Sequence, residues 1–141
     1  MKDNIMQQQF WSNRPTNVTG FDDEKDSSLN MRLLSLEEKP EAIVVTLNGY
    51  IDTYNTNYFS NKINKVISAG YATLILDCSM LNYVSSTGIG AMTGIMKTLK
   101  TKGGEIILLS VQPKVMEVFN LLGFSNFFVI IIYFLSESFN S

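Results

Sequence analysis

The sequence contains no histidine and only one cysteine, and these shortages exclude whole classes of chemistry. Without imidazole, no Ser-His-Asp or Cys-His nucleophile system can be assembled, and the commonest zinc sites lose one of their ligand types. A single thiol, Cys78, cannot form the internal disulfide framework of small secreted proteins. No paired-carboxylate or phosphate-loop spacing occurs either. We therefore expect a cytoplasmic binding protein with no cofactor and no metal, and not an enzyme.

Long apolar runs and a strong net charge are also missing. The longest apolar run, residues 127–135, is far shorter than the roughly 20 residues of a membrane helix, and its β-branched content predicts a buried strand. The first residues hold no apolar stretch that could form the core of a signal peptide. The formal charge of −2 creates no general attraction for nucleic acid or an acidic membrane surface. We expect neither membrane insertion nor a nucleic-acid partner.

Residues 1–30 are rich in Gln, Asn, Ser and Asp, with apolar residues only scattered among them. Such a segment buries too little apolar surface to offset the entropy of ordering, so it is predicted to be a flexible N-terminal extension. Docking of Phe10 and Trp11 on the domain, or on a second copy of it, is the alternative. The acidic residues 22–24 are interpreted as part of a solvated linker.

From residue 31 onward, strand and helix patterns alternate. Predicted strands cover residues 31–38, 42–48, 73–78, 105–111 and 127–133, and predicted helices cover about 59–70, 88–100 and 113–122. Residues 79–85 are predicted to be a loop. This order implies an α/β layer, a mixed and mostly parallel sheet with one antiparallel edge and helices packed on it. The domain is placed at residues 31–135, followed by a short tail at 136–141.

Three consecutive hydroxyl residues, Ser85, Ser86 and Thr87, stand at the predicted start of the second helix. The unpaired backbone N–H groups and the helix dipole there favour negative charge, so a phosphate on such a hydroxyl is tolerated. Serine and threonine are also ordinary N-cap residues, which explains the cluster without any function. The following glycines, Gly88 and Gly90, indicate close backbone approach, either of the sheet or of a partner.

Several short motifs recur in the order that is typical of one family. They are Leu47-Asn48-Gly49-Tyr50-Ile51-Asp52, Leu76-Asp77-Cys78-Ser79 leading to Val84-Ser85-Ser86-Thr87-Gly88-Ile89-Gly90, Lys102-Gly103-Gly104-Glu105, Pro113-Lys114-Val115 and Leu121-Leu122-Gly123-Phe124. From about Leu33 to Phe134 the sequence resembles the STAS domain family, in particular the anti-sigma-factor antagonists. In those proteins an acidic residue usually stands where this sequence has Ser85.

The resemblance implies which residues carry the function. In antagonists of this type, the hydroxyl two positions before the motif's glycine accepts phosphate from a kinase that is also an anti-sigma factor. That position is Ser86 here, with Thr87 as the alternative. The resemblance also places Asp52 beside the phosphorylation site, although Asp52 could equally cap the first helix. The implied partner-binding residues are Asp52, Ser85, Ser86, Thr87, Gly88 and Gly90.

Two functions are compatible with this resemblance. In the first, the unmodified domain sequesters an anti-sigma factor that is a serine-protein kinase of ATPase fold, and phosphorylation ends the binding in a partner switch that regulates transcription. A serine phosphatase would then reverse the switch. In the second, the domain is a structural or sensory module that acts by self-assembly or within a larger signalling complex, and Ser86 is never modified.

Overall fold

The structure, a computed structural model, describes residues 13–124 and 129–131 and follows the alternating order of strands and helices that the sequence predicts. The elements in chain order are β1 (Asn13–Thr16), η1 (Phe21–Asp23), β2 (Leu29–Leu36), β3 (Ala42–Ile51), α2 (Thr56–Ser68), β4 (Thr73–Val84), α3 (Ser86–Thr101), β5 (Glu105–Leu109), α4 (Pro113–Leu121) and β6 (Val129–Ile131). The predicted class, α/β with a mixed sheet, is confirmed.

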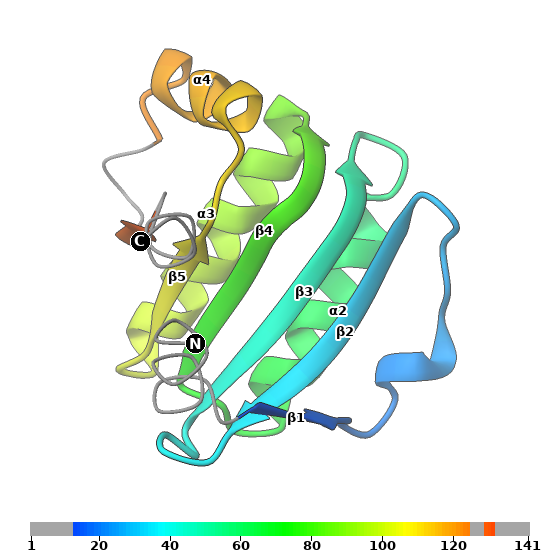
Figure 1. Cartoon of the computed structure of the whole chain (residues 1–141), viewed down its shortest axis with the longest axis vertical. Helices are drawn as coiled ribbons and strands as arrows, with labels where there is room; N and C mark the ends of the chain where they lie inside the picture. Colours follow the sequence, from blue (N-terminus) through cyan, green and yellow to red (C-terminus); the bar gives the residue numbers. More distant parts are fainter. Residues whose placement is uncertain (1–12, 125–128, 132–141) are drawn as a thin grey trace, which may run out of the picture.

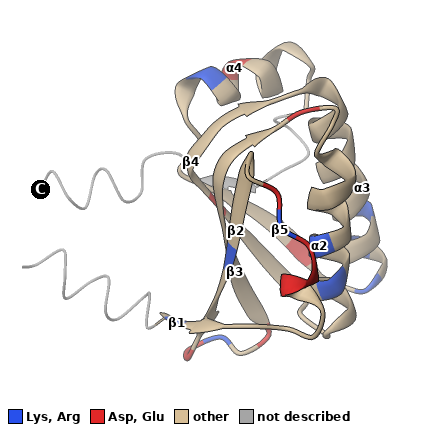
Figure 2. Ribbon diagram, turned by 90° about the vertical axis from the view of Figure 1, so that its right-hand side faces the viewer, with Lys and Arg blue, Asp and Glu red and all other residues tan. Residues whose placement is uncertain are grey.

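A single sheet runs in the order β1-β2-β3-β4-β5-β6. The pairs β1–β2 and β2–β3 are antiparallel, and the pairs from β3 to β6 are parallel. Helices α2 and α3 lie side by side on one face of the sheet, whereas α4 lies near the carboxyl end of β4 (Figures 1 and 2). Because parallel strands point the same way, the chain leaves β3 and β4 at the same end of the sheet.

The main core fills the space between the sheet and the two helices. The helix predicted at about 88–100 is α3, and it buries one apolar stripe that consists of Ile89, Met92, Ile95, Met96 and Leu99. Buried residues of α2, Phe59 and Ile63 among them, belong to the same apolar cluster. These two stripes hold the helices on the sheet and so place their N-termini next to each other.

The predicted loop at residues 79–85 is wrong, because β4 continues as a strand to Val84. The second half of β4 pairs with the end of β3, where Gly49 lies opposite Leu81 and Ile51 opposite Val84. Two register shifts interrupt this pairing. They break the strict alternation of apolar and polar residues that would have revealed the strand in the sequence.

The prediction of a flexible extension also differs from the structure over residues 13–30. Strand β1 pairs with the second half of β2, and Phe21 in η1 is 2% exposed because it packs in the main core. Backbone carbonyls of this segment accept hydrogen bonds from lysines of α2. Sequence reasoning missed this packing because it depends on one aromatic residue and on contacts with a helix far along the chain.

Some predictions fall on residues that the structure does not describe. Strand β6 occupies Val129–Ile131 within the predicted strand 127–133, and the remaining four residues of that strand lie outside the described residues, as do Phe10, Trp11 and the tail at 136–141. Within the described part of the chain, none of the helices is long and apolar enough to cross a membrane.

Candidate functional site

The predicted functional residues meet where β3 and β4 end. The N–H of Ser85, the first residue after β4, donates to the carbonyl oxygen of Ile51, the last residue of β3, at 2.8 Å. This bond ties the turn between β3 and α2 to the start of α3. Ligand and partner sites of parallel α/β sheets commonly lie at this carboxyl end of the strands.

The three consecutive hydroxyls have three different environments. Ser85 is buried, and its Oγ accepts a hydrogen bond of 3.0 Å from the N–H of Gly88, so it is the N-cap of α3. Thr87 is exposed, and its Oγ1 lies 3.3 Å from Oγ1 of Thr53. Ser86 is exposed and makes no side-chain hydrogen bond to another described residue. Of the two exposed hydroxyls, only that of Ser86 has no hydrogen-bond partner among the described residues.

Asp52 organises the turn between β3 and α2. One of its carboxylate oxygens, Oδ1, accepts hydrogen bonds from the N–H groups of Tyr54 at 2.8 Å and Asn55 at 3.0 Å. Its backbone carbonyl accepts a short hydrogen bond from the hydroxyl of Thr56. Asp52 therefore shapes the turn that leads into α2, and its neighbour Thr53 contacts the start of α3. The alternative that Asp52 caps the first helix is wrong, because the N-cap of α2 is Asn55 and the carboxylate accepts from N–H groups that precede the helix. Asp52 instead shapes the turn next to the hydroxyl cluster.

Packing requires glycine at position 88 but not at position 90. A Cβ atom added to Gly88 would lie 2.8 Å from Cγ2 of Ile51 and 2.9 Å from Cγ1 of Val84, so close packing of α3 on the strand ends requires glycine there. A Cβ added to Gly90 would meet nothing within 4 Å. Packing on the sheet thus explains Gly88, whereas Gly90 is exposed and lowers helix propensity without any packing benefit.

Three exposed tyrosines surround this end of the sheet, and sequence reasoning did not single them out. Tyr54 is 94% exposed in the turn that Asp52 organises, and the paired strand residues Tyr50 and Tyr83 are 40% and 52% exposed. Tyrosine is enriched among the residues that dominate protein interfaces. Tyr50 and Tyr83 each precede the buried last residue of a strand, and neighbouring side chains of a strand point to opposite faces of the sheet. The exposure of Tyr83 could therefore be predicted only if β4 were known to extend to Val84.

Cys78 and the acidic residues are the remaining candidates for chemistry among the described residues. The only thiol, Cys78, is buried, and burial raises its pKa well above the ordinary value for cysteine, which keeps it protonated. Among the described residues, no cluster of acidic, cysteine or histidine side chains could hold a metal ion. The ion pairs Arg14–Glu37 and Lys39–Glu41 lie at the opposite end of the sheet.

Residues 34–138 of this chain match the model of the STAS domain. The chain belongs to the STAS domain family. It is 31% identical to the anti-sigma F factor antagonist of Lysinibacillus sphaericus over 84 residues, which are 59% of this chain and 72% of that protein. It is 26% identical to the anti-sigma-B factor antagonist of Bacillus subtilis over 90 residues, which are 64% of this chain and 82% of that one.

The fold agrees with the same assignment. The structure of the anti-sigma factor antagonist SpoIIAA in its unphosphorylated form superposes with a TM-score of 0.60 at 27% identity, covering 72% of this chain and 87% of that one. The resemblance identified from the motifs around Ser86 is therefore confirmed for the family and the fold. These relatives are regulatory binding proteins.

Proposed function

We propose that this STAS domain is an anti-sigma-factor antagonist whose binding is switched by phosphorylation of Ser86. The observation that carries the proposal is the separation of the three hydroxyls: Ser85 is buried as the N-cap, Thr87 faces Thr53, and Ser86 is exposed without a partner among the described residues. Transfer of phosphate to the Ser86 hydroxyl therefore breaks no hydrogen bond within the described part of the chain. This placement also favours Ser86 over the alternative, Thr87.

A phosphate on Ser86 would change binding more than folding. It adds a charge of about −1.5 to −2 at pH 7, which the N-terminus of α3 tolerates through its dipole and its unpaired N–H groups. In an interface with a partner the same charge must be desolvated, next to the turn that contains the Asp52 carboxylate. A penalty of roughly 3 kcal/mol would weaken binding by on the order of 100-fold.

The proposed binding surface consists of the hydroxyl cluster, the Asp52 turn and the exposed part of α3 around Gly90. Tyr54 extends from this turn and is the residue best suited to be buried by a partner, because a tyrosine supplies a large contact area with few rotatable bonds. The partner that we propose is an anti-sigma factor that is also a serine-protein kinase of ATPase fold, reversed by a serine phosphatase. Such a role belongs in the cytoplasm, where transcription is regulated.

The test is to incubate the purified protein with ATP and its cognate anti-sigma factor kinase. One phosphate should be incorporated, it should be absent from Ser86→Ala, and it should persist in Ser79→Ala, whose serine is also exposed. Peptide mass mapping locates the phosphate. Incorporation at Thr87 would move the site by one residue and leave the mechanism intact. No incorporation at any residue would contradict the switch and favour an unmodified module that acts by assembly.

A further inference from the structure

Residues 17–28, called the N-terminal strap below, connect β1 to β2 and contact both α2 and the turn at the functional site. The strap precedes residue 34, where the match to the STAS family begins. Its contacts are therefore a property of this chain that the family assignment does not supply. They follow a continuous path of hydrogen bonds from the strap to the proposed binding surface.

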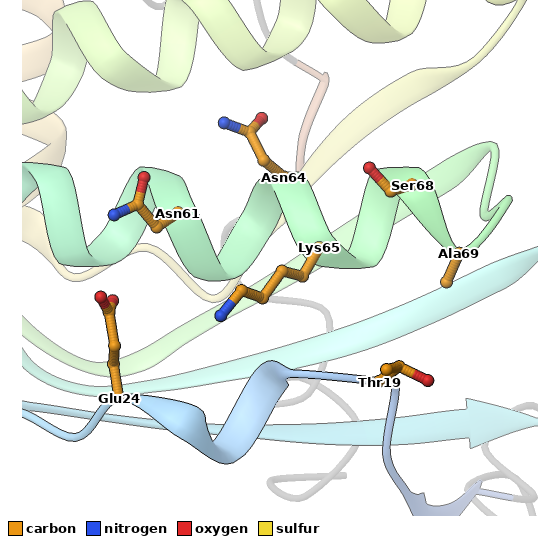
Figure 3. A pocket seen from close by; sticks show the side chains of 7 residues that line it. All are labelled: Thr19, Glu24, Asn61, Asn64, Lys65, Ser68 and Ala69. Atoms are coloured by element: carbon orange, nitrogen blue, oxygen red, sulfur yellow. The ribbon is translucent and has the colours of Figure 1, made fainter.

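The first part of the strap is held on α2 by two lysines. Lys62 is buried, and its Nζ donates to the carbonyl oxygens of Phe21 at 2.6 Å and Glu24 at 3.1 Å. The same ammonium group lies 4.2 Å from the centre of the Phe21 ring, and burial lowers the pKa of this lysine. Lys65 extends toward the strap and donates to the carbonyl of Gly20 at 2.7 Å (Figure 3). The strap is thereby fixed on the helix.

The last residue of the strap, Ser28, is fixed against the end of β3. Its carbonyl oxygen accepts a hydrogen bond of 3.1 Å from the N–H of Tyr50. Residue 49 must be glycine, because a Cβ there would lie 2.1 Å from that same carbonyl oxygen and the backbone φ is 132°. The Ser28 hydroxyl donates a short bond to Asp26 Oδ1 and accepts a 2.7 Å bond from Nδ2 of Asn55. Ser28 is thus a junction between the strap and Asn55.

Asn55 transmits this contact to the functional site. It is 3% exposed, and its Nδ2 also donates to the carbonyl oxygen of Tyr50 at 2.9 Å. Its Oδ1 accepts a 2.9 Å bond from the N–H of Asp52, while Asp52 Oδ1 accepts the N–H groups of Tyr54 and Asn55 in return. The hydrogen bond to Ser28 helps to orient the amide plane of Asn55, and the amide in turn holds the turn that carries Tyr54.

We infer that Ser28 is a positioning residue of the partner-binding surface, acting through Asn55 on the turn at residues 52–54. The inference rests on the proposed function for the assignment of that turn to the binding surface. The turn meets the start of α3 through the Thr53–Thr87 contact, so its position also sets the neighbourhood of Ser86. An interface residue that is already held in place loses less entropy on binding, which is why such support raises affinity.

Amide hydrogen exchange of the full chain tests the positioning without any partner. In Ser28→Ala, the amides of Tyr54 and Asn55 should exchange about fivefold faster, the change expected when one hydrogen bond no longer restrains local opening. Ser27→Ala is the matched control, because the Ser27 side chain is exposed and makes no hydrogen bond to another described residue. Ser28→Thr keeps the hydroxyl and should restore slow exchange.

Two results would overturn the inference. Exchange at Tyr54 and Asn55 that is equal in Ser28→Ala and Ser27→Ala would show that the serine does not restrain the turn. An equal acceleration at Leu76, in the centre of β4, would show that the substitution acts on the stability of the whole fold instead. The amide of Leu76 is therefore measured in the same experiment.

A second measurement separates this inference from the proposed function. The unphosphorylated wild-type protein, Ser28→Ala and Ser27→Ala are titrated against the cognate anti-sigma factor. Affinity should fall about fivefold in Ser28→Ala alone. Equal binding by all three proteins overturns the positioning role at the interface. Absence of binding by the wild type overturns the proposed function, while the exchange rates still decide whether Ser28 positions the turn.

Discussion

The starts of α2 and α3 lie next to each other at one end of the sheet, yet they are built in different ways. At the start of α2, the buried residues Asn55 and Thr56 join the strap, the end of β3 and the Asp52 turn in one set of hydrogen bonds. At the start of α3, one buried serine caps the helix, and the hydroxyls of the next two residues are exposed. The first arrangement holds the turn of the proposed binding surface in place, whereas the second exposes the hydroxyls of Ser86 and Thr87 to a partner.

The two helices also differ in their glycine content. Helix α2 contains no glycine, whereas α3 contains Gly88, Gly90 and Gly94. Only Gly88 is required by packing, since the positions of a Cβ at Gly90 and Gly94 are open. Two exposed glycines lower the intrinsic stability of α3 by about 1 kcal/mol each relative to alanine. A bare backbone on the exposed face of α3 fits close approach by a protein partner better than it fits stability.

The largest expected difference between the two helix starts concerns stability. Asn55→Ala would leave the N–H of Asp52 and the carbonyl of Tyr50 without their partner in a buried site, which should destabilise the protein by about 3 kcal/mol. Ser85→Ala removes one capping bond and should cost about 1 kcal/mol. Urea unfolding of both variants measures the difference. Equal losses would mean that the two starts support the fold equally.

The next largest effect should appear in binding and not in folding. Ser86→Asp places a negative charge at the N-terminus of α3, where it suits the helix dipole, so the free energy of unfolding should change by less than about 0.5 kcal/mol. Binding to the anti-sigma factor should weaken at least about tenfold. Thermal melts and pull-downs separate the two effects. A loss of stability comparable to that of a core truncation would show instead that Ser86 is a structural residue.

The sequence predicts α3 well because its signals are local. An apolar stripe with helical spacing and a cluster of N-cap residues are both contained in a short stretch, and they predict the start of the helix to within two residues. The predicted helix 88–100 corresponds to Ser86–Thr101 in the structure. The role of Ser85 as the N-cap follows from the same local rule. The assignment of Ser86 as the phosphorylated residue came from the family resemblance and stays a prediction.

The hydrogen bonds that hold the strap on α2 and on the turn before it could not be predicted, because the residues that form them are far apart in the sequence. Asn55 contacts Ser28 across 27 positions, and Lys62 contacts Phe21 across 41. A lysine in a helix is normally expected at the surface, so its burial against backbone carbonyls has no sequence pattern. The exposed Tyr83 was hidden for a related reason, since the register shifts in β4 disguise the strand in which it stands.

Substitutions of two glycines within α3 should change the free energy of unfolding by smaller amounts and in opposite directions. Gly88→Ala should destabilise the protein by about 1–2 kcal/mol, because the new methyl group overlaps the branched side chains of Ile51 and Val84. Gly90→Ala should stabilise it by up to about 1 kcal/mol, since its Cβ position is open and alanine favours the helix. Chemical denaturation gives both values. Stabilisation by both substitutions would contradict the close packing of α3 on the strand ends.

The smallest expected effect is a pH dependence of stability that acts on the start of α2 and not on the start of α3. Hydrogen bonds from the hydroxyl and the N–H of Ser28 hold the pKa of Asp26 below its ordinary value. A carboxyl group with a lowered pKa in the folded state contributes stability that is fully present above its unfolded pKa of about 3.9, and that is lost as the pH falls through the lower folded value. Because solvent still reaches the half-buried carboxylate and screens its charge, the contribution should stay below about 1 kcal/mol.

Asp26→Asn removes this titration while keeping a side-chain oxygen that can accept from Ser28, so the variant isolates the charge. Below pH 4, the amides of Tyr54 and Asn55 should lose protection in the wild-type protein, relative to rates in unstructured peptides at the same pH. They should lose less in the variant. The N–H of Gly88 donates to the Ser85 hydroxyl, which does not titrate, so its protection should not differ between the two proteins. If protection at Gly88 falls together with that at Asn55, the two helix starts respond as one unit, and the strap supports both.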